Sequence, residues 1–438
     1  MNPHREAVVE PLDLLRKTAF TFPAIDNHAH PLLRSQFRHQ VPLESIISEA
    51  PSGPSLIQDA AQTIACFRAA AQLSKVFTSS GEGGSEVSES PSLWQQVKQR
   101  REAMDYEELC DIFMKPCGIQ ALLLDDGLGG VSEWCEDWKW HRRFGCDTKR
   151  IVRIEDEAQR LLLPFLQPLL TLADSEVQNQ LQPILVEFFR RLQVNLSESA
   201  KDPEVVAFKS IICYRGGLNV RPRAELGVAT APNEQHDYAK VTESLFRAIV
   251  DFQSTGMLRL AHGEINEWIV HWGLRVAGEF DIPVQFHTGL GDSDIPLVHA
   301  SPAYMQPLIK EYPKTTFVLL HAAYPFTKEA GYLCSVYPNV MLDFGEIFPM
   351  VSGSGQRVAI QQVLELCPTN KILWSTDGHW HPESFFLGTI QARQALFDVL
   401  SEIVSRGELM ETEAARIVEQ ALFWNSKRVY KLDVDSEY

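Results

Sequence analysis

The chain has 438 residues, of which 45% are hydrophobic, so it can bury one large core or two ordinary ones. The formal net charge is -17, with 57 acidic against 40 basic residues, and the basic residues form no cluster. This balance argues against binding to nucleic acid or to an anionic membrane, because both need a positive surface. We therefore expect a protein whose partner is a small-molecule substrate.

Two further features of the sequence bear on its location. No stretch approaches the roughly 20 apolar residues of a membrane helix, and the first residues carry charges where a signal peptide would be apolar. The eight cysteines are scattered, with no CxxC pair, which is typical of reduced and mostly buried thiols. These patterns favour a cytoplasmic protein.

Short apolar runs that end in polar residues recur along the chain, with helical patterns between them. They cover residues 23–30, 118–127, 151–156, 205–212, 282–289, 315–323, 339–346 and 370–378. Such nearly continuous apolar strands are typical of a parallel sheet that is covered on both faces. Eight of them are enough to close an α/β fold of the (β/α)₈ TIM barrel type, in which active sites lie at the C-terminal ends of the strands.

Two extensions interrupt this series of strands. The longer one, residues 31–117, has too many residues for one crossover helix, and we predict a mainly helical insertion after the first strand. Within it, residues 78–92 are rich in Gly, Ser and Glu, which predicts a mobile surface loop. The other extension, residues 157–204, has a Leu-rich helical periodicity. We interpret residues 1–438 as a single barrel domain.

The first apolar run ends in Asp26, His28 and His30, which alternate along the chain. On a strand these three side chains share one face, and at the end of a barrel strand that face is the interior. Two imidazoles there can bind one cation. A single HxH motif is also compatible with two histidines that are buried for structural reasons.

The later runs add side chains at equivalent positions. His287 closes the fifth run, His321 closes the sixth and Asp377 closes the eighth. Imidazole and carboxylate ligands suit Zn²⁺ and its neighbours Mn²⁺, Fe²⁺ and Co²⁺, and the lack of thiolates in the set argues against a structural zinc site. We therefore predict an open catalytic site for one or two divalent ions, with zinc as the expected metal.

This order of ligands resembles that of the amidohydrolase superfamily, and the resemblance spans nearly the whole barrel. The stretch FKSIICYRGGL is similar to the dihydropyrimidinase and hydantoinase branch, where the fourth-strand lysine is carboxylated and bridges two metals. The resemblance implies that Lys209 is an N6-carboxylated metal ligand and that Tyr214 binds the developing oxyanion. From the residues alone, Lys209 is equally compatible with an ion-pair partner at a strand end.

Other motifs resemble a narrower group, the amidohydrolase-related domain of fungal FluG and of nodulin/glutamine synthetase fusions. They are YRGGL, HTGLGD, LLHAAYPF, WSTDGHW and ALFWNSKRVYKL. In those relatives a glutamine synthetase domain follows the barrel. This sequence stops at Tyr438, and we expect a free-standing version of the barrel.

The resemblance implies cleavage of an amide-type C–N bond of a small molecule by a metal-activated hydroxide. Asp377 would accept the proton of the water and pass it to the leaving group. His321 would act as a ligand or as an acid and base. Arg215 suits a substrate carboxylate or an oxyanion, although an ion pair with a barrel acid is equally compatible. Trp380 is the other predicted substrate contact.

Two alternatives stay open at this point. A zinc-dependent decarboxylase of the aminocarboxymuconate decarboxylase type uses HxH, His and Asp around one zinc, with His321 as acid or base. A FluG-like regulatory protein with incidental catalysis is the other. The helical segment 31–117 could also pack against a second copy of the chain, which would give a homodimer.

Overall fold

A computed structural model describes residues 12–79, 91–229 and 235–436 of the chain. The loop that we expected to be mobile at residues 78–92 lies mostly outside the described residues. In the part of the chain that is described, no helix is long and apolar enough to cross a lipid bilayer.

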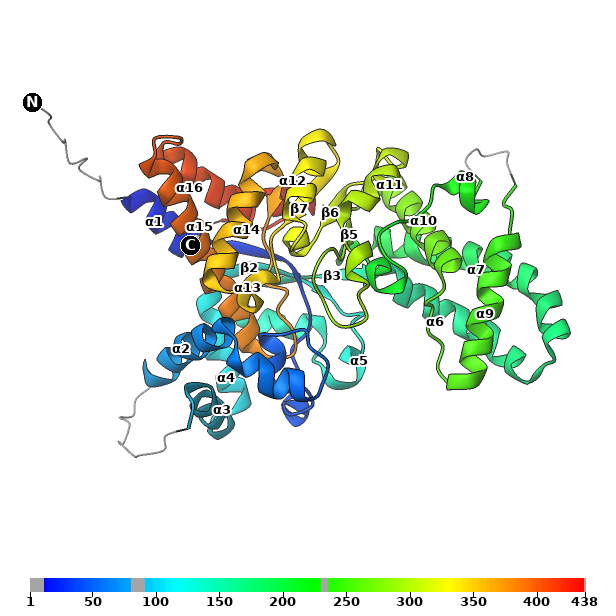
Figure 1. The fold of residues 1–438 in the computed structure, drawn as a ribbon, viewed down its shortest axis with the longest axis horizontal. Helices are drawn as coiled ribbons and strands as arrows, with labels where there is room; N and C mark the ends of the chain where they lie inside the picture. The colour runs from blue at the N-terminus through cyan, green and yellow to red at the C-terminus, as the bar shows by residue number, and fades with distance from the viewer. Residues whose placement is uncertain (1–11, 80–90, 230–234, 437–438) are drawn as a thin grey trace, which may run out of the picture.

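Eight parallel strands form one sheet in which each strand pairs with the next along the chain. Their bounds are β1 Ala24–Ala29, β2 Ile119–Asp125, β3 Asp147–Arg153, β4 Val205–Ser210, β5 Val284–Phe286, β6 Phe317–Leu319, β7 Val340–Asp343 and β8 Ile372–Leu373. Beyond β8 the chain bonds to β1, since Asn27 N donates to Trp374 O at 3.3 Å and Asp377 N donates to His28 O at 3.1 Å. These bonds bring the last strand back to the first, and the predicted barrel is confirmed (Figure 1).

Helices surround the strands. Their bounds are α1 Asp13–Thr21, α2 Ile64–Ser79, α3 Leu93–Ala103, α4 Tyr106–Met114, α5 Val131–Trp134, α6 Ile154–Leu166, α7 Asp174–Lys201, α8 Arg223–Leu226, α9 Ala239–Thr255, α10 Gly263–Phe280, α11 Gln306–Glu311, α12 Thr327–Val336, α13 Ile347–Met350, α14 Gly353–Leu366, α15 Pro382–Ser405, α16 Glu411–Glu419 and α17 Asn425–Val429. In Figure 1, α2, α3 and α4 gather below one end of the barrel, and α7 and α9 lie at the opposite end of the molecule.

Inside the barrel, small and branched side chains from most strands form a buried cluster. It includes Ile25, Ala121, Ile151, Ala207, Val318, Met341 and Leu373, together with Phe423 and Tyr430 from the C-terminal region. Gln285 on strand β5 lies at the same level of the barrel as Val318, because it pairs in register with Lys209 on β4 and with Val318 on β6. Gln285 and Lys209 therefore form a polar pair beside this apolar cluster, near the ends of β4 and β5.

The third strand differs from our expectation. The apolar run suggested residues 151–156, but β3 is Asp147–Arg153 and the chain turns directly into α6 at Ile154. The start of β3 is polar and partly exposed, so a search for apolar runs misses it. The acids that follow lie in the first turn of α6, where they complement the positive end of the helix dipole.

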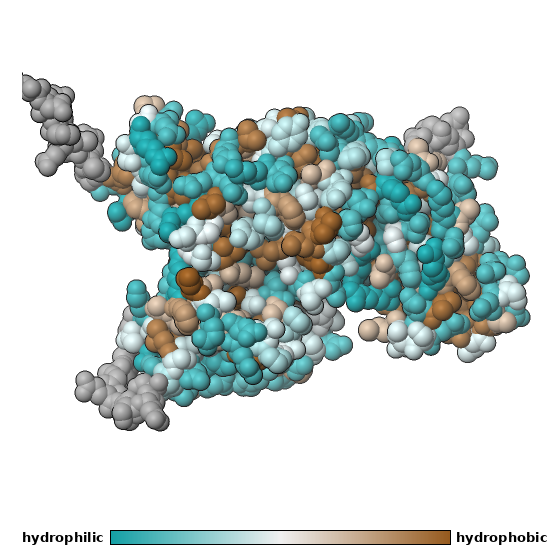
Figure 2. All heavy atoms as spheres, viewed as in Figure 1, coloured by the Kyte–Doolittle hydropathy of each residue, from teal (hydrophilic) through white to brown (hydrophobic). Residues whose placement is uncertain are grey.

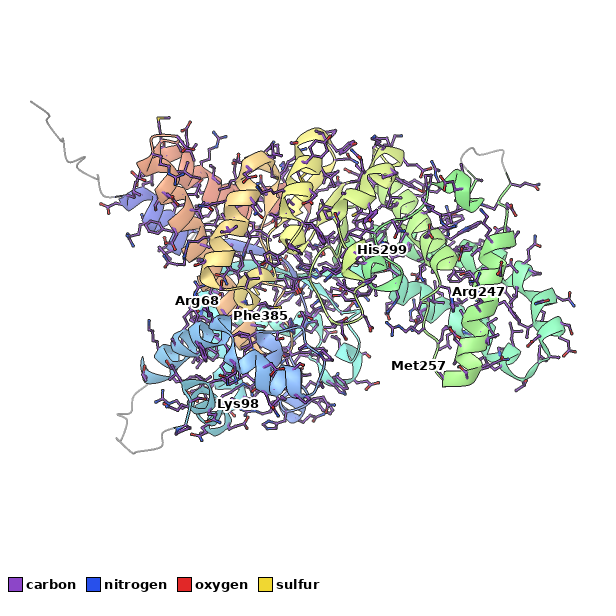
Figure 3. All side chains as sticks on the ribbon, viewed as in Figure 1. Arg68, Lys98, Arg247, Met257, His299 and Phe385 are labelled. Carbon is purple, nitrogen blue, oxygen red and sulfur yellow. The ribbon has the colours of Figure 1, made fainter. Side chains whose placement is uncertain are left out.

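The segment between β1 and β2 packs against the barrel through α2. Arg68 on α2 donates to Gln356 on α14, and it reaches Gln391 on α15 at 3.5 Å. Figure 3 labels Arg68 on α2 and Phe385 on α15, and Phe385 is wholly buried. On the face shown in Figure 2, the rim is mainly hydrophilic and apolar residues gather toward the middle. The bonds of Arg68 to α14 and α15 fix the position of the segment between β1 and β2 on the barrel.

Candidate metal centre and active site

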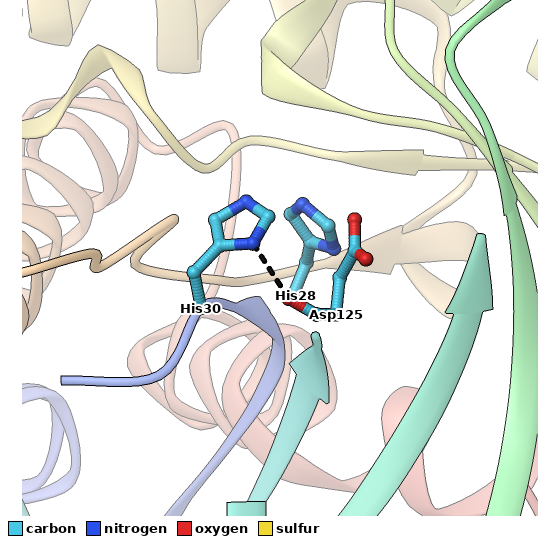
Figure 4. A group of neighbouring side chains, drawn as sticks. All are labelled: His28, His30 and Asp125. Carbon is cyan, nitrogen blue, oxygen red and sulfur yellow. Dashed lines mark hydrogen bonds between the residues drawn. The ribbon is translucent and has the colours of Figure 1, made fainter. Parts of the chain in front are cut away.

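The two histidines of the HxH motif leave the end of β1 with their Nε2 atoms directed into the barrel mouth. His30 Nδ1 lies 2.8 Å from the backbone carbonyl of Asp125, shown by the dashed line in Figure 4. A carbonyl can only accept, so Nδ1 of His30 carries the proton and Nε2 keeps its lone pair. Both rings are buried, with centroids 5.1 Å apart.

The tautomer of His28 is fixed by the buried amide of Gln285. Gln285 Nε2 donates to the carbonyl of Asn27 at 2.7 Å and to the hydroxyl of Tyr430 at 2.8 Å. The Asn27 carbonyl cannot donate, so this orientation of the amide leaves Oε1 facing His28 Nδ1 at 2.8 Å. His28 therefore donates from Nδ1 and, like His30, presents a lone pair at Nε2.

Asp377, which follows β8, brings a carboxylate against both lone pairs. Its Oδ1 lies 3.3 Å from His28 Nε2 and 3.5 Å from His30 Nε2. This oxygen is buried and has no hydrogen-bond partner among the described residues. Three lone-pair atoms that face one another without a hydrogen between them repel, unless a cation lies among them. The donor set of two imidazoles and one carboxylate fits Zn²⁺ or a similar ion.

Lys209 ends β4 beside this group. Its Nζ lies 3.1 Å from His28 Nε2, and the side chain is 2% exposed. Burial lowers the pKa of Lys209 to about 8, although Asp125 and Asp377 act in the opposite direction. Burial also lowers the pKa of His28 to about 4, so that imidazole is neutral near pH 7. A neutral imidazole and an amine that loses its proton readily are the forms that bind metals.

A second group of donors lies next to the first. His287, His321 and Glu346 offer ligand atoms that lie within 4.8 Å of one another. His321 Nδ1 and Glu346 Oε2 are 3.3 Å apart, and both atoms are buried without a hydrogen-bond partner. Burial lowers the pKa of both imidazoles and raises the pKa of Glu346 well above its ordinary value. The mouth thus has donors for one ion or for two.

Tyr214 and Arg215 lie in η8, Ile212–Arg215, directly after β4. The Tyr214 hydroxyl is 3.1 Å from His287 Nε2, and that nitrogen also lies 2.8 Å from the carbonyl of Leu290. Burial raises the pKa of Tyr214 well above 10, so the phenol keeps its proton and can donate it. No described residue forms a hydrogen bond or ion pair with the Arg215 guanidinium.

These side chains surround one cavity of about 410 Å³ at the barrel mouth. All nine residues that we selected from the sequence line it, namely His28, His30, Lys209, Tyr214, Arg215, His287, His321, Asp377 and Trp380. Trp380 packs against Trp134 with ring centroids 6.1 Å apart. The geometry therefore brings the predicted ligands, the phenol and the guanidinium to a single space.

The structure adds residues that our reading of the sequence missed. Glu346 follows β7, and its run ends in a polar residue like the others, so the same criterion would have found it. Asp125 ends β2 and pairs with Arg153 at 2.6 Å. Glu49 comes from the segment after β1 and lines the cavity. No local pattern marks Glu49, because it reaches the site through the packing of the whole segment.

Comparison with known proteins agrees with this geometry. Residues 239–432 match the family model described as "Amidohydrolase". The protein FluG of Emericella nidulans is 38% identical over 436 residues, which are 96% of this chain. The chain spans about half the length of this relative, namely 47%.

Solved structures share the fold at lower identity. A protein from Lactobacillus casei, proposed to be a metal-dependent hydrolase, aligns with a TM-score of 0.73 and 21% identity, over 95% of this chain and 97% of that one. A uronate isomerase from Thermotoga maritima aligns with a TM-score of 0.58 and 14% identity, over 96% and 97%. The same barrel therefore also occurs in an enzyme whose reaction is not a hydrolysis.

Proposed function

This chain belongs to the amidohydrolase family, and on that premise we propose that it is a metal-dependent hydrolase that cleaves an amide-type C–N bond of a small molecule. The observation that carries the proposal is the meeting of the His28, His30 and Asp377 donor atoms, with no hydrogen between them, at the wall of a cavity. A divalent cation bound there lowers the pKa of a coordinated water toward 7 and polarises a carbonyl oxygen.

The protein's own groups then have separate tasks. We assign to Asp377 the acceptance of the proton of the attacking water, because its carboxylate lies at the cavity wall beside the His28 and His30 donors. The protonated Tyr214 phenol supplies a donor for the oxygen that becomes negative at the scissile carbonyl. His321 and Glu346, 3.3 Å apart, are a second ligand pair or an acid and base beside the first group.

Lys209 is the residue on which a two-metal site depends. We propose that its neutral amine adds to CO₂ and loses one proton, which gives an N6-carboxylated lysine with two ligand oxygens. The lowered pKa and nearly complete burial support this reaction, because the nucleophile is the unprotonated amine. Zinc is the metal that we propose, as one ion without this modification or as two ions with it.

The remaining expectations are proposals about binding. Arg215 and Trp380 line the cavity and would contact the substrate. We propose a cytoplasmic protein with a small-molecule substrate and without nucleic-acid or membrane partners, in keeping with the acidic composition. A homodimer through the segment after β1 is a further proposal.

The test is a substrate screen with the full chain, before and after removal of metal by a chelator. The screen includes N-acyl amino acids, γ-glutamyl amides, lactams and aromatic acids, with products identified by mass spectrometry. We expect release of an amine that stops with the chelator and returns with Zn²⁺. Release of CO₂ from an aromatic acid by a protein with one metal would instead support the decarboxylase alternative.

A further inference from the structure

The cavity at the barrel mouth contains one basic and one acidic side chain that have no hydrogen-bond or ion-pair partner within the described chain. Arg215 is half-buried, and no described residue forms a hydrogen bond or ion pair with it. Glu49 is also half-buried and equally lacks a hydrogen bond or ion pair within the described ranges. Half-buried charges without partners at a cavity wall are suited to a ligand of complementary charge.

Neighbouring side chains show why Arg215 in particular is available. Two other arginines lie near it, and both are already paired: Arg153 with Asp125 at 2.6 Å, and Arg259 with Asp294 at 2.5 Å. Glu155, Asp292 and Asp294 also lie near Arg215, but no acid among the described residues forms an ion pair with it. A planar guanidinium that is free to form two parallel hydrogen bonds matches a carboxylate.

Glu49 has the opposite surroundings. Its charged neighbours include the carboxylates of Asp377 and Asp292, with His379 as the neighbouring imidazole. Together, the carboxylates of Glu49, Asp292 and Asp377 favour a cation. A metal ion held by Asp377 would compensate part of this negative charge, but Glu49 itself belongs to neither donor group described above.

The two side chains come from different parts of the chain and line one cavity. Arg215 directly follows β4, whereas Glu49 belongs to the segment after β1 and lies near His379, which follows β8. Tyr214 and Asp292, which follows β5, are also neighbours of Glu49, so this carboxylate extends over the mouth toward the ends of β4 and β5. The His28, His30 and Asp377 donors line the same cavity, so a molecule that contacts both Arg215 and Glu49 lies beside them.

We propose that this cavity binds a zwitterionic amide, with its carboxylate against Arg215, its ammonium against Glu49 and the scissile C–N bond between them. The ligand class is a dipeptide or an isomer of one in which a free amine and a free carboxylate flank the amide. This inference rests on the hydrolase function proposed above, and it names the substrate class of that site.

The test uses four probes with one backbone: L-alanyl-L-alanine, its N-acetyl form, its C-terminal amide, and the doubly blocked form. Binding to the chelator-treated full chain is measured by calorimetry, since both charges that recognise the ligand belong to the protein. We expect the zwitterion to bind best. Glu49→Gln should weaken binding of probes with a free amine at least about tenfold, and Arg215→Gln should do the same for probes with a free carboxylate.

Glu187→Gln and Arg191→Gln on α7 are the matched controls, because this exposed pair lies outside the cavity. Equal binding of the doubly blocked probe and the zwitterion would overturn the inference, as would Glu49→Gln weakening all four probes alike. Charge-dependent binding without hydrolysis after zinc is restored would keep the inference and contradict the proposed function. Hydrolysis of blocked amides alone would keep the function and contradict the inference.

Discussion

Replacement of Gln285 by leucine removes the amide that accepts a hydrogen bond from His28 Nδ1. The substitution leaves every proposed metal ligand in the sequence unchanged. The change leaves His28 Nδ1 and the Asn27 carbonyl buried without partners, and it removes a bond to Tyr430. Each buried polar group left unsatisfied costs about 1–3 kcal/mol, so we expect the free energy of unfolding to fall by about 2–6 kcal/mol. Loss of such a supporting bond should weaken metal affinity about 10- to 100-fold.

The assay for Gln285→Leu is competition for Zn²⁺ against a chromophoric chelator, together with urea denaturation of the metal-free protein. Gln391→Leu is the control, because Gln391 is equally buried and bonds to Gln356 and Gln72, away from the cavity. The control should lose stability and keep its zinc affinity. If both variants kept wild-type zinc affinity, the reasoning that Gln285 fixes the His28 tautomer would be refuted.

Three further changes test other parts of the account. His141 is buried and accepts from Leu32 N at 3.0 Å, and burial lowers its pKa from 6.5 to about 4. The unfolded state therefore takes up the proton first, so about 3 kcal/mol of stability is present above pH 6.5 and is lost as the pH falls to 4. The free energy of unfolding of His141→Gln, measured by denaturation at several pH values, should lack this pH-dependent contribution. A pH profile identical to that of the wild type would contradict the assignment to His141. Tyr214→Phe should lower kcat about 10²- to 10³-fold at unchanged metal content, and an unaltered kcat would exclude the oxyanion role. Gly291→Ala should impair turnover more than stability, because a Cβ there overlaps the Tyr214 hydroxyl and His287 Nε2. Wild-type turnover in this variant would show that the positions of Tyr214 and His287 are not needed for the reaction.

The strand-end residues could be predicted from the sequence because a barrel brings the ends of all its strands to one mouth. His28, His287 and Asp377 each close an apolar run, and each lines the cavity. Lys209 and Tyr214 came from a family resemblance, and spacing alone did not select them.

Other parts of the site could not be read in this way. Gln285 lies inside an apolar run, and its importance comes from bonds to residues over 100 positions away in the chain. Glu49 reaches the mouth through the folding of a long segment, and β3 begins with polar residues that hide it from a hydrophobicity search.

Elemental analysis of the purified full chain and of His28→Ala tests the central claim most directly. The wild-type protein, supplemented with Zn²⁺ and bicarbonate and then desalted, should retain one or two metal ions per chain. His28→Ala should retain none, with an unchanged circular dichroism spectrum, and His271→Ala should bind metal like the wild type, because His271 bonds to Tyr312 outside the cavity. Full metal occupancy in His28→Ala, or no metal in the wild type, would contradict a metal centre at the barrel mouth.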